Sequence, residues 1–278
     1  MKVAAVQMTS NLSVDDNLAR ARDLVADAVA EGAKLVVLPE NVCLMTDTHE
    51  RRLAAAARGQ EVAKRLAETA RELNVCLVGG TVPLPAAGDL VTNSCLVFAA
   101  NGQQLGRYDK MHLFDVDLGD GQVYRESDYT AAGDEPLIVE MLDMRVGITV
   151  CYDLRFPELY RRLALNGAEV FTVPSAFTVS TGRAHWEVLL RARAIENLAA
   201  VIAPAQVGHH AGGRVTYGHS TIISPWGEIL ASRREGNGVV VGEIDLDELR
   251  GRRRDFPALC HRRWIDTGPV QMNFCSKK

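Results

Sequence analysis

The sequence predicts a layered α/β fold in which two mixed β-sheets pack on each other and helices cover their outer faces. Apolar runs rich in β-branched residues alternate with segments of helical periodicity, as in βαβ units. This plan, closed by a hairpin, occurs twice along the 278 residues. We find no Pro-, Gly- or Ser-rich linker between the two halves, so we expect a single domain over residues 1–278.

The first half is expected to alternate strands with helices and to close with a hairpin. Its expected elements are, in order, strand 2–7, helix 15–31, strand 34–38, helix 53–73, strand 75–79 and hairpin strands 93–99 and 103–108. The strands are short apolar runs, whereas the helices have apolar residues at helical spacing. Asn101 and Gly102 lie between the hairpin strands, and Asn-Gly is a strong signal for a tight turn.

The second half repeats this order of elements. They are strand 144–150, helix 157–165, strand 170–173, helix 185–197, strand 199–204 and hairpin strands 220–223 and 228–231. The hairpin turn is expected at Pro225, Trp226 and Gly227. Because each half has its own parallel strands and its own hairpin, we expect two separate mixed sheets.

The composition is typical of a soluble globular protein and excludes two classes of partner. Hydrophobic residues make up 47% and charged residues 24% of the chain, and the formal net charge is −4. This charge gives no electrostatic footprint for nucleic acid or an anionic membrane. The basic residues 250–254 are interrupted by Gly251 and flanked by acidic ones, so we interpret them as a solvated patch. No apolar stretch approaches the ~18 residues of a membrane-spanning helix.

The cysteines indicate reduced thiols and a cytoplasmic protein. The chain has no Cys-x-x-Cys pair and no spacing typical of metal ligands, so we expect no metal site. The scattered cysteines are Cys43, Cys76, Cys95, Cys151, Cys260 and Cys275. Residues 1–7 have the pattern of a first strand rather than of a signal peptide, which favours a reducing compartment.

Three reactive side chains follow predicted strands directly. Cys151 follows the apolar run 144–150, and Glu40 follows a strand that Pro39 ends, because proline cannot donate to a sheet ladder. Lys110 follows the second strand of the first hairpin. Residues that handle ligands gather at the carboxyl ends of strands in α/β sheets, so these three side chains can meet. Each one alone also fits a structural role, as a packed thiol, a surface carboxylate or a solvated amine.

Together the three side chains supply what a thiol needs to attack a carbonyl carbon. The Cys151 thiol must lose its proton, and the Glu40 carboxylate can accept it and later return it to a leaving group. The Lys110 ammonium can stabilise both the thiolate and the oxyanion of the tetrahedral intermediate. This chemistry requires neither a metal nor an organic cofactor.

The segments around these positions resemble the signature motifs of the nitrilase superfamily of carbon–nitrogen hydrolases. In order, they are Leu38-Pro39-Glu40, the run Asp109 to Phe114, and the run Val150 to Leu159. The resemblance covers nearly the whole chain, and it implies Glu40 as general base, Lys110 as the intermediate-stabilising lysine and Cys151 as nucleophile. It also implies a second glutamate after the lysine, which matches Glu126.

The resemblance further implies a four-layer α-β-β-α sandwich with internal pseudo-symmetry, usually dimeric or larger. This agrees with the two halves described above, and we expect a homodimer or a higher homo-oligomer. The implied reaction is the hydrolysis of a small amide through a cysteine thioester, giving a carboxylate and ammonia.

Residues 174–178, 181–187 and 191–197 resemble amidases that act on ω-amides of 2-oxo acids, and residues 205–210 and 214–220 are more similar to those acting on deaminated glutathione. Deaminated glutathione is the favoured substrate, since the run 174–177 reads Pro-Ser-Ala-Phe and amidases of 2-oxoglutaramate tend to carry Gly in its second place. 2-Oxoglutaramate is the alternative substrate. Arg183 stands where both groups usually carry Pro, which leaves the shape of that loop open.

The candidates for lining the substrate pocket are Tyr152, Phe177, Thr178, Thr181 and His185. Loop packing is the alternative interpretation of these residues.

Three other functional classes fit the sequence less well than an amidase does. A nucleotide-binding protein would carry a glycine-rich phosphate motif after a strand, and this chain has none. A redox protein using Cys151 would have a resolving cysteine nearby in sequence, and a non-catalytic relative would lack one of the implied catalytic residues.

Overall fold

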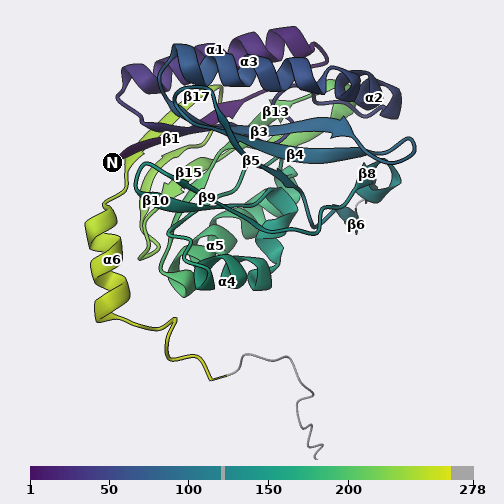
Figure 1. The fold of residues 1–278 in the computed structure, drawn as a ribbon. Helices are drawn as coiled ribbons and strands as arrows, with labels where there is room; N and C mark the ends of the chain where they lie inside the picture. Colours follow the sequence, from purple (N-terminus) through teal and green to yellow (C-terminus); the bar gives the residue numbers. More distant parts are fainter. Residues whose placement is uncertain (120–122, 264–278) are drawn as a thin grey trace, which may run out of the picture.

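Apolar residues on both faces of the central strands are buried, which places the two sheets between two layers of helices (Figure 1). The computed structural model describes residues 1–119 and 123–263. The covering helices are α1 (Val14–Ala30) and α3 (Gly59–Glu72) on one sheet and α4 (Pro157–Leu165) and α5 (Val179–Asn197) on the other. The expected α-β-β-α sandwich with two mixed sheets is confirmed.

In the described part of the chain, the first sheet has nine strands. Its order is β14 (Val215–Tyr217), β13 (Ala205–His209), β1 (Lys2–Met8), β2 (Leu35–Val37), β3 (Cys76–Pro85), β4 (Val91–Phe98) and β5 (Gln104–Asp109). Two further strands join it, with β17 (Gly238–Glu243) beside β1 and β8 (Thr130–Ala131) beside β4. The second half of the chain thus contributes strands to the sheet of the first half.

The second sheet has six strands among the residues that the structure describes. Its order is β16 (Ile229–Arg233), β15 (Ser220–Ile223), β12 (Ala200–Ala203), β11 (Val170–Thr172), β10 (Met144–Ile148) and β9 (Leu137–Met141). A separate ribbon pairs β6 (Asp115–Asp117) with β7 (Val123–Arg125).

The two sheets repeat one pairing pattern, which is the internal pseudo-symmetry expected from the sequence. Strands β1, β2 and β3 are parallel, and the antiparallel strands β4 and β5 follow on one side. Strands β10, β11 and β12 are likewise parallel and are followed by the antiparallel strands β15 and β16. On the other side, β17 lies antiparallel to β1 as β9 does to β10.

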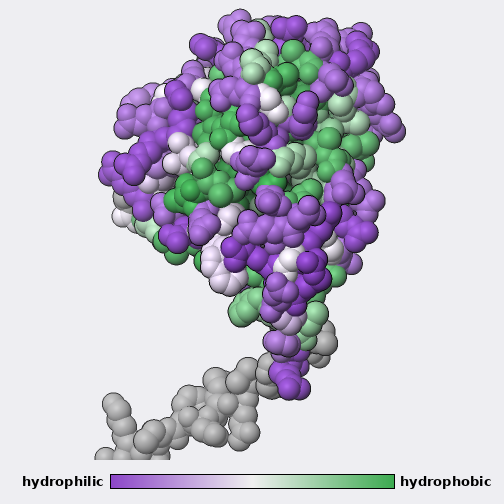
Figure 2. Space-filling model, turned by 90° about the vertical axis from the view of Figure 1, so that its left-hand side faces the viewer, coloured by the Kyte–Doolittle hydropathy of each residue, from purple (hydrophilic) through white to green (hydrophobic). Residues whose placement is uncertain are grey.

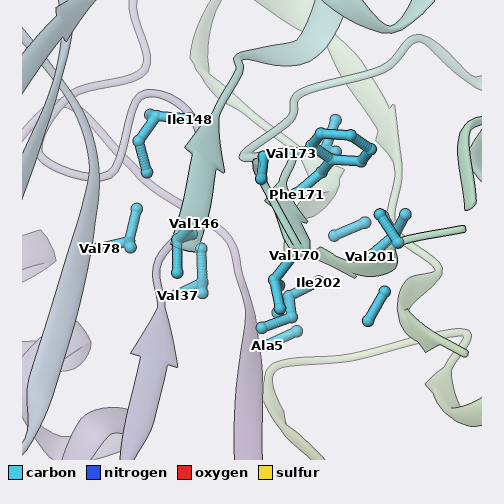
Figure 3. Packing of buried hydrophobic residues seen from close by; sticks show 14 of the residues in the cluster. Ala5, Val37, Val78, Val146, Ile148, Val170, Phe171, Val173, Val201 and Ile202 are labelled. Carbon is cyan, nitrogen blue, oxygen red and sulfur yellow. The ribbon is translucent and has the colours of Figure 1, made fainter. Parts of the chain in front are cut away.

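Alternation along each strand divides the core into layers. Val3 and Ala5 of β1 belong to the cluster that fills the space between the sheets and continues to α4 and α5, whereas Ala4 and Val6 belong to the cluster under α1 and α3. Figure 3 shows the inter-sheet layer, where Val37 and Val78 of the first sheet lie beside Val146 and Ile148 of the second. Since both faces are buried, these strands are nearly continuous apolar runs in the sequence.

Two expected helices differ from those observed. The expected helix 53–73 is two helices, α2 (His49–Ala57) and α3, which meet at Arg58. Gly59, the first residue of α3, packs so closely on Leu84 that a Cβ there would collide with its side chain. Helix α5 begins at Val179 rather than at residue 185, because Thr178 accepts a hydrogen bond from Thr181 N and caps it.

The C-terminal part of the described chain leaves the sandwich. Helix α6 (Leu246–Asp255) extends beyond the sheets on the side of the N-terminus (Figure 1). On that face, apolar residues gather above α6 between hydrophilic ones (Figure 2). No helix within the described ranges is long and apolar enough to cross a membrane. One domain over residues 1–278 stays a prediction, since 264–278, with Cys275, lie outside the described residues.

Replacing Gly80 by alanine should destabilise the protein where Gly80 packs against Leu38 and Pro39, the residues that precede Glu40. Gly80 has φ +64°, and a Cβ there would collide with the carbonyl oxygen of Pro39. We expect Gly80→Ala to lower the free energy of unfolding by about 2–4 kcal/mol, because alanine is strained in this left-handed backbone conformation and its Cβ overpacks the site. Urea denaturation measures this change.

Gly88→Ala is the matched control for this measurement. Gly88 has nearly the same φ, +63°, but a Cβ added there would meet no atom within 4 Å. Its alanine variant should lose only the ~1–2 kcal/mol of the backbone conformation. Equal losses in the two variants would mean that the contact between Gly80 and Pro39 contributes nothing.

Candidate active site

Glu40 lies just past the end of β2 and points into the protein. The sheet pairing of β2 ends at Val37, and Leu38 N still donates to Val78 O at 2.9 Å before Pro39 ends the ladder. The backbone oxygen of Glu40 accepts a hydrogen bond of 2.9 Å from Nε2 of Gln206. Glu40 is 3% exposed, so the alternative of a surface carboxylate is wrong.

Lys110 follows β5 directly and is held between two carboxylates. Its Nζ lies 2.9 Å from Oε1 of Glu40 and 2.8 Å from Oε2 of Glu126. The Lys110 backbone N–H donates to Asn93 O at 3.0 Å, which extends the pairing of β4 and β5 by one residue. Lys110 is 2% exposed and is therefore not a solvated amine. These ion pairs fix the ammonium at one position.

Cys151 begins a 3₁₀ turn (Cys151–Arg155) that follows β10. Its φ of +48° is unusual for a residue other than glycine, and such strained residues cluster at functional sites. The Cys151 N–H donates to Pro174 O at 2.9 Å and holds the turn against the end of β11. Among the described residues, the next N–H, that of Tyr152, has no hydrogen-bond acceptor. An N–H left free beside a thiol can receive a developing oxyanion.

Burial and charge set the protonation states of the cluster. Burial raises the pKa of the Cys151 thiol, the charge of Glu40 raises it further, and the Lys110 ammonium opposes both without cancelling them. Burial alone would lower the pKa of Lys110, but the charges of Glu126 and Glu40 outweigh it and hold that pKa well above its ordinary value. Near neutral pH, Lys110 is therefore an ammonium and Cys151 a thiol.

Glu126 and Asn93 complete the cluster. Glu126 begins the 3₁₀ turn after β7, is 8% exposed, and accepts a hydrogen bond of 2.7 Å from Phe114 N. Asn93 Nδ2 donates to Glu40 Oε1 at 3.0 Å and to Glu126 Oε1 at 3.2 Å. Sequence reasoning missed Asn93, although a polar residue in an apolar hairpin strand, opposite the lysine, is a usable signal.

A buried carboxylate joins the cysteine turn to the lysine segment. Asp153 is fully buried, and its Oδ2 accepts hydrogen bonds from Val150 N at 2.8 Å and from the Tyr108 hydroxyl at 2.7 Å. Its Oδ1 accepts from His112 N at 3.1 Å and lies 2.7 Å from His112 Nδ1. Tyr108 and His112 flank Lys110 in the sequence, so Asp153 fixes Cys151 relative to Lys110.

The cluster opens onto a cavity with a mixed lining. Of the five pocket candidates, Tyr152, Phe177, Thr178 and Thr181 line it, and His185 does not. The other lining residues are Glu40, Asn41, Leu44, Met45, Thr46, Arg52, Pro83, Val91, Thr92, Asn93, Lys110, Phe114, Tyr124, Glu126, Tyr129, Thr130, Cys151, Arg155, Ala176 and Arg214. Arg52, Tyr129 and Arg214 were not anticipated, because an isolated arginine or tyrosine in a polar segment gives no sequence signal.

The early start of α5 explains the position of His185. The expected loop around Arg183 is helical, and both Arg183 and His185 are exposed on it. His185 Nδ1 lies 3.2 Å from Nη1 of Arg155, which does line the cavity. His185 therefore contacts the cavity wall from outside rather than forming part of it.

Comparisons with known proteins agree with the fold and with the motifs. The family model for carbon-nitrogen hydrolase matches residues 2–254. A deaminated glutathione amidase of Synechocystis is 45% identical over 94% of this chain and 98% of its own length. The human omega-amidase NIT2 is 34% identical over 94% of this chain and 95% of its own.

A solved structure shows the same architecture. The NitFhit protein of C. elegans superposes with a TM-score of 0.89 at 35% identity, covering 94% of this chain and 65% of its own. The present chain thus spans about two thirds of that longer protein. Because the family model matches residues 2–254, which is most of this chain, the chain belongs to the carbon–nitrogen hydrolases of the nitrilase superfamily.

Proposed function

We propose that this amidase hydrolyses an ω-amide of a 2-oxo acid, with deaminated glutathione as the favoured substrate and 2-oxoglutaramate as the alternative. The observation that carries the proposal is the buried Lys110 ammonium between Glu40 and Glu126, beside Cys151 in one cavity. The chain is 45% identical to a deaminated glutathione amidase and 34% identical to an omega-amidase, and this difference supports the choice of substrate.

The first step couples attack to proton transfer. Since Cys151 is a neutral thiol near neutral pH, its proton passes to the Glu40 carboxylate as the sulfur bonds to the amide carbon. The carbonyl oxygen becomes an oxyanion, which the Lys110 ammonium and the free N–H of Tyr152 stabilise. Glu126, with its oxygen 2.8 Å from Nζ, keeps the ammonium in place throughout.

The second half of the reaction reverses the proton movement. Protonated Glu40 gives its proton to the nitrogen of the leaving group as the C–N bond breaks, and a thioester on Cys151 remains. Water then attacks the thioester carbon while Glu40 accepts one of its protons. When the C–S bond breaks, the sulfur takes back that proton from Glu40. The cluster ends as it began, so no external acid or base is consumed.

The leaving group depends on the substrate, which corrects the expectation of ammonia. Deaminated glutathione is 2-oxoglutarate joined to cysteinylglycine, so it has no primary amide. Breaking its ω-amide bond releases the amine of cysteinylglycine, whereas 2-oxoglutaramate releases ammonia. Both substrates give 2-oxoglutarate.

We include a homodimer or a higher homo-oligomer and a cytoplasmic location in the proposal. Trp226 and Phe256 support the first point, since they are 46% and 53% exposed and their rings pack 5.8 Å apart. The five cysteines in the described ranges are all free, which agrees with a reducing compartment.

Cys151→Ala should abolish amide hydrolysis without unfolding the protein. Loss of the nucleophile removes the thioester route, so we expect kcat to fall by roughly 10³-fold or more. Release of 2-oxoglutarate measures the rate, and circular dichroism checks the fold. Turnover at the wild-type rate would contradict the proposed mechanism. No turnover of any amide by the wild-type protein would favour a non-catalytic, nitrilase-like binding protein.

Glu40→Gln should make the Cys151 thiol easier to ionise while it slows amide hydrolysis. Burial raises the pKa of Cys151 and the negative charge of Glu40 raises it further, so a neutral side chain at residue 40 lowers that pKa and shifts the pH profile of Cys151 alkylation toward lower pH. Amide turnover should fall by roughly 10²–10⁴-fold, because the general base is lost. Iodoacetamide labelling of the Cys151 peptide, followed by mass spectrometry, measures the profile.

Glu50→Gln provides the control for this experiment. Glu50 is exposed on α2, so its variant carries the same change of charge away from the cavity. Its alkylation profile should match that of the wild type. A Glu40→Gln profile that stays in place, or moves to higher pH, would show that Glu40 does not act on the thiol.

Deaminated glutathione should have a higher kcat/KM than 2-oxoglutaramate. Its cysteinylglycine part adds contacts in the cavity, and a tenfold preference needs only about 1.4 kcal/mol. Formation of 2-oxoglutarate, the product common to both substrates, allows the two rates to be compared in one assay. A preference for 2-oxoglutaramate would instead assign the omega-amidase reaction.

A further inference from the structure

The cavity is positively charged although the protein as a whole is acidic. The chain has a formal net charge of −4. Two anionic side chains, Glu40 and Glu126, line the cavity, against the four cations Arg52, Lys110, Arg155 and Arg214. Lys110 is already paired with both glutamates. The arginines are therefore an excess of positive charge that the catalytic cluster does not use.

Arg52 enters the cavity wall from α2. Its guanidinium stacks on the ring of Tyr129, with Cζ 3.7 Å from the ring centroid, and Nη2 donates to Thr46 O at 2.7 Å. This is the only hydrogen bond of its five N–H donors within the described residues, and the buried Nη1 has no partner. The stacking fixes the plane of the guanidinium and leaves most of its donors unused.

Arg214 reaches the same cavity from the segment between β13 and β14. Its Nη2 donates to Ala176 O at 2.7 Å, and its Cζ lies 5.5 Å from the centroid of the Tyr124 ring. In the described ranges, the buried Nε of Arg214 has no hydrogen-bond partner. A second guanidinium with an unused buried donor thus lies at the wall of the cavity.

The two arginines are close enough to affect each other and have no carboxylate partner. Burial lowers the pKa of Arg52 and the nearby charge of Arg214 lowers it too, while Tyr129, Glu126 and Asp47 offset only part of this effect. No ion pair joins either guanidinium to a carboxylate in the part of the chain that the structure describes. Like charges placed together destabilise a protein unless an anion binds between them. The arrangement is therefore complementary to an anionic ligand.

We propose that Arg52 and Arg214 form a carboxylate subsite of the substrate cavity, so that this enzyme selects amides that carry a carboxylate away from the scissile bond. The inference rests on the proposed function and assigns the residues that recognise the substrate. Guanidinium groups suit this task, because they bind carboxylates through two parallel hydrogen bonds. The carboxylate can come from the 2-oxo acid end or from the glycine end of deaminated glutathione.

The test compares Arg52→Gln and Arg214→Gln with wild type in a binding assay that needs no turnover. Iodoacetamide alkylates Cys151, and 2-oxoglutarate, a dicarboxylate, should protect it by occupying the cavity. We expect each variant to need roughly 10- to 100-fold more 2-oxoglutarate for half protection, the loss typical of a charge-assisted hydrogen bond. Unchanged protection in both variants, together with an unchanged kcat/KM on deaminated glutathione, would overturn the subsite.

Arg51→Gln is the matched control, because Arg51 is the exposed neighbour of Arg52 on α2. Its variant loses the same charge and should be protected as the wild type is. Arg52→Lys keeps the charge without the planar fork, so intermediate protection is expected. An unprotected alkylation rate equal to that of wild type shows that each variant keeps an intact site. If Arg51→Gln lost as much protection as Arg52→Gln, the effect would come from the overall charge of the protein rather than from a subsite, which would contradict the proposal.

Turnover then identifies the source of the carboxylate. If the variants lose kcat/KM on both deaminated glutathione and 2-oxoglutaramate, the subsite binds the 2-oxo acid end, which the two share. A loss confined to deaminated glutathione assigns the glycine carboxylate. If wild type hydrolyses neither amide, the proposed function fails, while the protection assay still decides whether the arginines bind a carboxylate.

Discussion

The site depends on one buried ammonium that is held by two carboxylates. Removing Lys110 and its partners from water costs several kcal/mol for each ion, and this is offset only when every partner is in place. Glu40 follows β2, Lys110 follows β5, and Glu126 follows the ribbon of β6 and β7. Asn93 of β4 then joins both carboxylates. The cluster therefore forms only when β2, β4, β5 and the ribbon of β6 and β7 are in place, and in the proposed function the substrate would meet a preformed site.

A third buried carboxylate connects that cluster to Cys151, the proposed nucleophile. Asp153 follows Cys151 by two residues, yet it is bound by Tyr108 and His112, on either side of Lys110. The cysteine turn belongs to the second sheet and the lysine segment to the first, so this contact crosses between the two halves of the pseudo-symmetric fold. Because Asp153 is fully satisfied, it can hold the strained backbone of Cys151 at low cost.

The sequence could predict site residues that directly follow a recognisable strand, but not those that reach the site only through tertiary packing. Cys151, Glu40 and Lys110 follow strands, and the ends of strands are visible as the ends of apolar runs. Glu126 came only from the resemblance, since its turn has no regular pattern. His185, a pocket candidate, lies outside the cavity lining on α5, a helix whose start was placed six residues late. Arg52 looks like a solvated residue of a short helix, and only the tertiary structure places it beside Arg214.

The distribution of charge in the cavity would allow the proposed anionic substrate to reach Cys151, which lies next to two carboxylates. Burial, together with the negative charge of Glu40, raises the pKa of Cys151 and keeps the resting thiol protonated. The same charge would repel a substrate that carries a carboxylate. Arginines on the cavity wall offset this repulsion without touching the thiol. In the proposed mechanism, attack begins only when the sulfur gives its proton to Glu40, so a bound amide, rather than the resting environment, determines when the nucleophile forms.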